Sequence, residues 1–174
     1  MVRELHLRSR SAAATEAVGE ALGRALEPGA LVTLDGELGS GKTCFVRGLA
    51  RGLDVEDRVS SPTYALLQTY TGRMPLAHLD AWMEGRERAF LADGGLEALP
   101  ADGVTVIEWA DRIAELLPPE RLALRLEHAG PETRELVLRV AGASERTAAL
   151  AGALTELGRR ARALHGDLEV VDRG

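Results

Sequence analysis

The chain has 174 residues, of which 45% are hydrophobic, and this is enough for one globular domain with an adequate core. Its formal net charge is −6, and no block of five or six like charges interrupts the sequence. This balance argues against tight binding of nucleic acid or of an anionic membrane by the chain alone. One cysteine excludes an internal disulfide, no apolar run reaches the roughly 18 residues of a membrane span, and the N-terminus lacks a secretory hydrophobic region. We therefore expect a cytoplasmic protein without membrane contact.

The first thirty-four residues predict a strand, a helix and a second strand. Residues 4–8 alternate between apolar and polar side chains, as an edge strand does. Ser11 can cap a helix whose apolar residues recur at helical spacing until Pro28 and Gly29 end it. Residues 30–34 are a short apolar, β-branched run that is typical of a buried strand.

The octapeptide after this strand fits the phosphate-binding P-loop pattern G-x-x-x-x-G-K-[ST]. It reads Gly36, Glu37, Leu38, Gly39, Ser40, Gly41, Lys42, Thr43. Its glycines let successive backbone N–H groups point into one concavity at the positive end of the next helix, where a triphosphate binds. Lys42 is the only lysine in the chain, and a slim ammonium reaches between phosphate oxygens where a planar guanidinium is too wide. We expect residues 37–43 to bind a nucleoside triphosphate, with Lys42 at the β and γ phosphates and the Thr43 hydroxyl on Mg²⁺.

The sequence around the octapeptide supports this interpretation. A helix is predicted directly after it, with Phe45 and Leu49 on one face. The alternative is a glycine turn that matches the pattern by chance, and the strand and helix in the required order count against it. Cys44 lies in the first turn of this helix, where the dipole favours a thiolate, but we interpret it as a packing residue.

The rest of the chain predicts two hairpins, two helices and one further buried strand. A largely polar segment at residues 60–64 comes first. The elements then follow as a hairpin of residues 64–70 and 75–80, a short helix near 87–92, a strand at 104–107, a hairpin of residues 122–128 and 135–140, and a helix from Ser144 to about Leu164.

These elements predict an α/β protein with the P-loop NTPase fold. The expected sheet is mixed and mostly parallel, with antiparallel hairpins added and helices on both faces. We expect one P-loop ATPase domain over residues 1–166. Residues 167–174 are expected to form a C-terminal tail that can be disordered.

Two predicted strands end in carboxylates, at the sheet edge where α/β proteins bind their ligands. Glu108 follows the apolar run 104–107, and Asp80 ends the run 75–80. Mg²⁺ on the β and γ phosphates needs one or two carboxylates. Glu108 is the first choice as metal partner, which leaves Asp80 to orient the attacking water or to hold a metal-bound one. The alternative is that both are surface acids or helix caps, and His78 is interpreted as a structural histidine.

Taken together, these residues resemble the TsaE family, also called YjeE, the ATPase of bacterial tRNA threonylcarbamoyladenosine synthesis. The resemblance covers about residues 5–160. It rests on the P-loop, on Ser61-Pro62-Thr63-Tyr64, on His78-x-Asp80 and on Glu108-Trp109, all in the family's order and spacing. Many families share the P-loop, whereas Ser-Pro-Thr-Tyr together with Glu-Trp is specific. The family usually continues His-x-Asp with Leu-Tyr-Arg, and this chain has Ala81-Trp82-Met83 instead.

The resemblance implies an ATPase that is weak by itself and serves a complex with the proteins TsaB and TsaD. TsaD would transfer the threonylcarbamoyl group to adenosine 37 of tRNA, so that tRNA meets this chain only through the complex.

The resemblance also assigns roles to single residues. Thr63 would sense the γ-phosphate or Mg²⁺ in a switch loop, while a turn with a buried Tyr64 explains the segment equally well. Trp109 would direct Glu108, contact the nucleotide or serve the partner interface, and core packing is the alternative. Ser11 and Arg134 would add further nucleotide contacts.

Two other functions use the same scaffold. A small-molecule kinase needs a mobile lid with arginines, and the segment 85–88 is too short and too mixed in charge to resemble one. A nucleotide-dependent interaction protein without turnover would not need two strand-end carboxylates.

Overall fold

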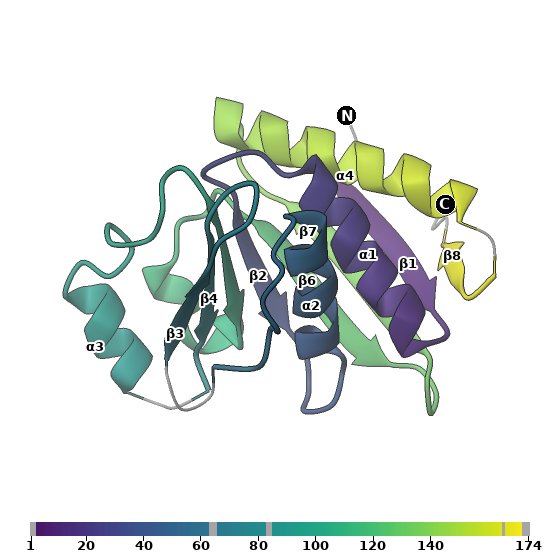
Figure 1. Cartoon of the computed structure of the whole chain (residues 1–174), viewed down its shortest axis with the longest axis horizontal. Helices are drawn as coiled ribbons and strands as arrows, with labels where there is room; N and C mark the ends of the chain where they lie inside the picture. Colours follow the sequence, from purple (N-terminus) through teal and green to yellow (C-terminus); the bar gives the residue numbers. More distant parts are fainter. Residues whose placement is uncertain (1–2, 63–65, 83–84, 165, 172–174) are drawn as a thin grey trace.

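One mixed sheet forms the centre of the computed structural model, which describes residues 3–62, 66–82, 85–164 and 166–171 (Figure 1). The strands lie in the order β3-β4-β5-β2-β6-β7-β1-β8. Their bounds are Glu4–Ser9 for β1, Leu31–Asp35 for β2, Leu67–Tyr70 for β3, Leu76–Asp80 for β4, Val104–Glu108 for β5, Leu122–His128 for β6, Arg134–Val140 for β7 and Leu168–Val170 for β8. Parallel pairing is confined to the central strands β4, β5, β2 and β6, and the flanking strands pair antiparallel. The predicted mixed sheet with added antiparallel hairpins is confirmed, but three pairings between the described strands are parallel and four antiparallel, so the sheet is not mostly parallel.

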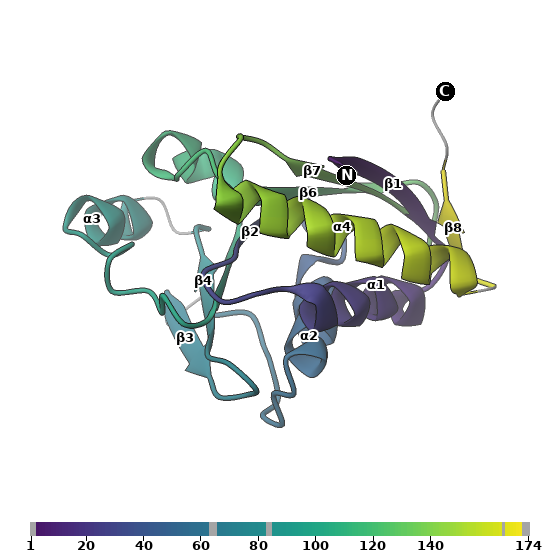
Figure 2. The same ribbon diagram turned by 90° about the horizontal axis from the view of Figure 1, so that it is seen from above.

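Helices pack against both faces of the sheet, three on one side and shorter elements on the other. Helices α1 (Ala12–Ala25), α2 (Lys42–Gly52) and α4 (Glu145–Ala163) lie together on one side (Figure 2). They bury the larger apolar core, to which β1, β2, β6 and β7 also contribute. On the opposite side, α3 (Arg86–Ala92) and the 3₁₀ segment η1 (Ala110–Leu116) pack over β4, β5 and β2 in a smaller core.

The prediction of helices on both faces is confirmed, although the second face is covered only in part. Among the described elements, none of the helices covers the second face of β6, β7, β1 and β8. This face carries charged side chains that pair across the strands, such as Arg8 with Glu135 and Arg139 with Glu4, both at 2.6 Å. Charged pairs can stay in water, so this half of the sheet is stable without a second helical layer.

Helices α1 and α2 touch through their backbones because glycines line their contact. A Cβ atom at Gly48 would lie 1.9 Å from the carbonyl oxygen of Glu16, and one at Gly19 would lie 2.2 Å from that of Phe45. No side chain fits at such distances. The P-loop helix is thus held rigidly against α1.

The N-terminal and C-terminal strands differ from the sequence-based expectation. Residues 4–8 were expected at the sheet edge, but β1 lies between β7 and β8. The expected tail contributes β8, in which Leu168, Glu169 and Val170 pair with residues of β1. The expectation that the tail can be disordered is therefore wrong for these three residues. The reason is that β1 offers an unpaired edge, which a short strand can complete.

The remaining predicted elements appear within a few residues of their expected bounds. Of the strand predicted at 64–70, the structure describes residues 66–70 and forms β3 over Leu67–Tyr70. Among the described residues, the structure contains no helix long and apolar enough to cross a lipid bilayer.

Candidate phosphate-binding site

The P-loop connects β2 to α2 at the carboxyl end of the parallel strands. Gly36 comes directly after β2, and a Cβ atom there would lie 2.5 Å from the carbonyl oxygen of Leu126. Gly41 is the N-terminal cap of α2 and has φ of 104°, a left-handed conformation that favours glycine. Both positions therefore require glycine for the loop to wrap around the start of the helix.

Lys42 is the first residue of α2, and its ammonium is held inside the loop. Its Nζ donates to the carbonyl oxygens of Gly36 at 2.6 Å and Glu37 at 3.0 Å. The same atom lies 3.9 Å from the centroid of the Trp109 ring, a cation–π contact. Burial lowers the pKa of Lys42, against the opposing effect of the Glu108 carboxylate. A phosphate group that enters must replace these contacts with its own oxygens.

An aromatic wall faces this lysine. Trp109 follows β5 with φ of 58° and ψ of 36°, a left-handed conformation that is unusual for a bulky residue and marks a constrained position. Its ring centroid lies 4.6 Å from that of Trp82. Arg112 stacks on Trp82 at 4.6 Å and donates to the carbonyl oxygen of the same residue. The sequence analysis missed Trp82 and Arg112, because no local pattern predicts that β4 and η1 bring these side chains together.

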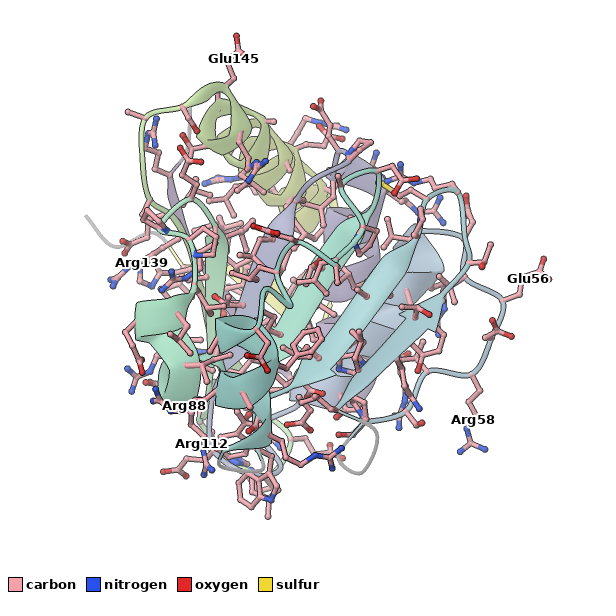
Figure 3. All side chains as sticks on the ribbon, turned by 90° about the vertical axis from the view of Figure 1, so that its left-hand side faces the viewer. Glu56, Arg58, Arg88, Arg112, Arg139 and Glu145 are labelled. Carbon is pink, nitrogen blue, oxygen red and sulfur yellow. The ribbon has the colours of Figure 1, made fainter. Side chains whose placement is uncertain are left out.

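Arg112 also joins η1 to α3. Figure 3 shows Arg112 and Arg88 beside each other, and the Arg88 guanidinium donates to the carbonyl oxygen of Arg112 at 2.8 Å. Arg88 is paired with Glu115 as well. These two arginines thus tie the second helical layer to the aromatic wall, whereas Glu56 and Arg58 extend from the distant loop after α2 (Figure 3).

The two predicted carboxylates meet next to the P-loop. Asp80 and Glu108 end neighbouring parallel strands and are Cα partners in the register. The Thr43 hydroxyl donates to Oε1 of Glu108 at 3.2 Å. Oδ2 of Asp80 accepts from the Ser61 hydroxyl at 2.9 Å, and its Oδ1 accepts from the backbone N–H of Trp82 at 2.9 Å. The structure therefore brings together the three predicted metal partners Thr43, Asp80 and Glu108.

Buried beneath Glu108 is His78. Its Nε2 lies 2.7 Å from Oε2 of Glu108, and its side chain is fully buried. His78, interpreted from the sequence as a structural histidine, is therefore in direct contact with Glu108, a predicted site residue.

The oxygen ligands around Thr43 fit Mg²⁺, which also binds phosphate oxygens and water, better than a metal that is bound only by protein side chains. Within the described ranges, no group of three or more His, Cys, Asp or Glu side chains could hold a metal ion. Mg²⁺ needs no such group, because one or two carboxylates, a hydroxyl, phosphate oxygens and water complete its octahedron. The pair formed by Thr43 and Glu108 supplies one hydroxyl and one carboxylate oxygen, and Asp80 lies on the adjacent strand.

These residues surround a cavity of about 450 Å³. Its size is that of a small-molecule site. It is lined by Leu38, Gly39, Gly41, Lys42, Thr43, Cys44, Ser61, Asp80, Trp82, Glu108 and Trp109. Leu38 is 79% exposed at the tip of the P-loop.

Four predicted nucleotide-binding residues lie outside this lining. Ser11 caps α1, where its hydroxyl accepts from the N–H of Ala14 at 3.1 Å. Arg134 donates to the carbonyl oxygens of Ser40 at 3.1 Å and Gly39 at 3.2 Å, so it stabilises the backbone of the P-loop. Glu37 and Ser40 contact Lys42. Nucleotide contacts from these four residues stay predictions, and Thr63 lies outside the described residues.

Two further side chains near the P-loop have perturbed pKa values. Burial raises the pKa of the Cys44 thiol, whose Sγ lies 3.2 Å from the carbonyl oxygen of Ala12. This favours the packing interpretation over a thiolate. Burial also raises the pKa of Asp35, which accepts from the N–H of Asp111 at 2.7 Å and so attaches η1 to the end of β2.

The fold and the site define a P-loop nucleotide-binding protein. The family model described as threonylcarbamoyl adenosine biosynthesis protein TsaE matches residues 9–136. This chain belongs to the TsaE family.

Known relatives agree with this assignment. The tRNA threonylcarbamoyladenosine biosynthesis protein TsaE of Treponema pallidum is 41% identical over 130 residues, which cover 75% of this chain and 96% of the relative. The protein of the same name from Bacillus subtilis is 35% identical over 143 residues, or 81% of this chain and 89% of the relative. The crystal structure of Bacillus subtilis YdiB superimposes with a TM-score of 0.71 and 32% identity, covering 92% of this chain and 97% of YdiB.

Proposed function

We propose that this chain is the ATP-binding and ATP-hydrolysing component of the machinery that makes N6-threonylcarbamoyladenosine at adenosine 37 of tRNA. It acts in the cytoplasm together with TsaB and TsaD. The observation that carries the proposal is the meeting of Lys42, Thr43, Asp80 and Glu108 around one cavity, in a chain whose relatives are named for this modification.

The P-loop would bind the triphosphate. Backbone N–H groups at the start of α2 would donate to the phosphate oxygens, and the helix dipole would favour their negative charge. Lys42 would turn from the carbonyl oxygens of Gly36 and Glu37 to the phosphate oxygens. Its ammonium would then neutralise charge on the leaving and transferred groups.

Thr43 and Glu108 would hold Mg²⁺. Mg²⁺ held there would supply positive charge that stabilises the charge developing on the phosphate oxygens. The Thr43 hydroxyl now donates to Oε1 of Glu108, so both groups are already adjacent.

Asp80 would orient the attacking water. One of its oxygens is held by Ser61 and the other by the backbone of Trp82, and this fixes the plane of the carboxylate. A fixed acceptor can position water for in-line attack on the γ-phosphorus. Ser61 belongs to the segment predicted as a switch loop, which would couple the nucleotide state to this position.

We expect the isolated chain to hydrolyse ATP slowly, because few positive charges line the cavity. Among the described residues that line the cavity, Lys42 alone carries a positive charge. Phosphoryl transfer is accelerated strongly when a further cation reaches the transition state. We expect TsaB and TsaD to stimulate turnover.

Incubation of the chain with ATP and Mg²⁺, with and without TsaB and TsaD, tests this function. Phosphate release that rises when both partners are present is the expected result. A phosphorylated small molecule would instead identify a kinase. Nucleotide binding without turnover in any mixture would identify an interaction protein, and either outcome would contradict the proposal.

A further inference from the structure

We propose that His78 is a positioning residue that fixes the Glu108 carboxylate for Mg²⁺. This inference rests on the metal role that the proposed function gives to Glu108. His78 lies in the middle of β4, two residues before Asp80, and its side chain is fully buried. Its Nε2 lies 2.7 Å from Oε2 of Glu108. A carboxylate oxygen can only accept, so Nε2 carries the hydrogen and donates it.

This hydrogen bond divides the two oxygens of Glu108 between two tasks. Oε2 is bound by His78, while Oε1 faces the Thr43 hydroxyl at 3.2 Å. Without the imidazole, the carboxylate could rotate and present either oxygen, or neither, toward Thr43. Groups that bind a metal ligand from behind in this way set its orientation, and their loss costs about 10- to 100-fold in metal affinity or activity.

The surroundings of His78 argue against a packing role. Its Nδ1 is buried, and within the described part of the chain it has no hydrogen-bond partner. An unsatisfied buried polar atom costs about 1 to 3 kcal/mol, which an apolar side chain would avoid. Val106, its partner in the register of β5, and Leu76, two residues earlier on β4, are both apolar and buried. The contact with Glu108 is what distinguishes histidine from a hydrophobic residue here.

Mg²⁺ titrations of nucleotide affinity test this role without depending on turnover. The affinity of a fluorescent ATP analogue is measured at increasing Mg²⁺ concentrations for the wild type, His78→Leu and His78→Gln. We expect His78→Leu to raise the Mg²⁺ midpoint by about 10- to 100-fold while affinity without Mg²⁺ stays near the wild-type value. His78→Gln should restore most of the midpoint, because its terminal amide reaches about as far as Nε2 and can donate.

Two controls separate positioning from a general loss of structure. Val106→Ala removes buried volume on the same face without removing the donor, and we expect its Mg²⁺ midpoint to match the wild type. His78→Asn keeps a polar amide that is too short to reach Glu108, so we expect it to raise the Mg²⁺ midpoint as His78→Leu does. It provides the test if the leucine variant folds poorly.

The possible outcomes distinguish this inference from the proposed function. A wild-type Mg²⁺ midpoint in His78→Leu or His78→Asn would overturn the inference alone. An equal shift in Val106→Ala, or no rescue by His78→Gln, would also overturn it, because the effect would then be structural. If the wild type binds the analogue equally with and without Mg²⁺, the metal role of Glu108 itself is wrong.

Discussion

Lys42 lies where only a slender cation fits. The residue is 5% exposed, and its ammonium lies between the carbonyl oxygens of the loop and the ring of Trp109. We expect Lys42→Arg to lose ATP hydrolysis by about 100-fold or more, because the guanidinium fork must displace the loop or the ring. Lys42→Ala should be equally inactive. Phosphate release measured in the presence of TsaB and TsaD checks both variants, and normal turnover by the arginine variant would refute the steric argument.

Asp80 and Glu108 should divide the work between them. Glu108→Gln is expected to lose the Mg²⁺-dependent increase in nucleotide affinity, because Glu108 faces Thr43. Asp80→Asn is expected to bind Mg²⁺ and ATP normally and to lose hydrolysis by about 100-fold, as expected when a group that orients the nucleophile is removed. Calorimetric titrations with ATP, combined with phosphate release, separate binding from turnover. The reversed pattern would exchange the two roles.

At the scale of the elements, α1 and α2 are in direct backbone contact. We expect Gly48→Ala to lower the free energy of unfolding by about 3 kcal/mol or more, because its Cβ atom would lie 1.9 Å from the carbonyl oxygen of Glu16. Gly152→Ala in α4 is the matched control. A Cβ atom there meets nothing within 4 Å, so the variant should be stabilised by up to about 1 kcal/mol. Urea denaturation measures both changes, and a neutral Gly48→Ala would contradict the close packing.

Most elements were predictable because their hydrophobic periodicity is local. The P-loop strand and helix, both hairpins and the long C-terminal helix appear where the sequence places them. Two elements were missed for physical reasons. Strand β8 has three residues and forms only because β1 offers it an edge. Segment η1 is a 3₁₀ helix with non-helical φ and ψ at Ile113, so it follows no 3.6-residue period.

The site was predictable in its parts and not in its contacts. The P-loop pattern and the two strand-end carboxylates selected Lys42, Thr43, Asp80 and Glu108 as candidates, and the structure places all four around one cavity. The contact of His78 with Glu108 depends on the register between β4 and β5, which no local pattern gives. For the same reason, spacing along the chain could not show that Arg134 braces the P-loop from β7.

At the scale of the whole molecule, the net charge predicts that the isolated chain has little affinity for tRNA. The net charge is −6, and surface arginines such as Arg8, Arg139 and Arg159 are paired with glutamates. Unpaired basic side chains that contact phosphates supply most non-specific affinity for nucleic acid. Arginines that are paired with glutamates are less able to make such contacts. We expect the isolated chain to show no tRNA binding at micromolar concentrations and physiological salt, as measured by calorimetry. Micromolar affinity that falls steeply with salt would contradict this and assign tRNA contacts to the chain itself.

The central claim is that ATP and Mg²⁺ bind in the P-loop cavity, and the chain contains its own reporter for it. Both of its tryptophans, Trp82 and Trp109, line this cavity, and Lys42 contacts Trp109 directly. Titration of ATP and Mg²⁺ against tryptophan fluorescence should give a saturable change with one site per chain. Lys42→Ala should weaken this binding by about 10- to 100-fold, as the loss of charge-assisted hydrogen bonds predicts. An absence of saturable change in the wild type, or the same binding curve in both proteins, would contradict the claim.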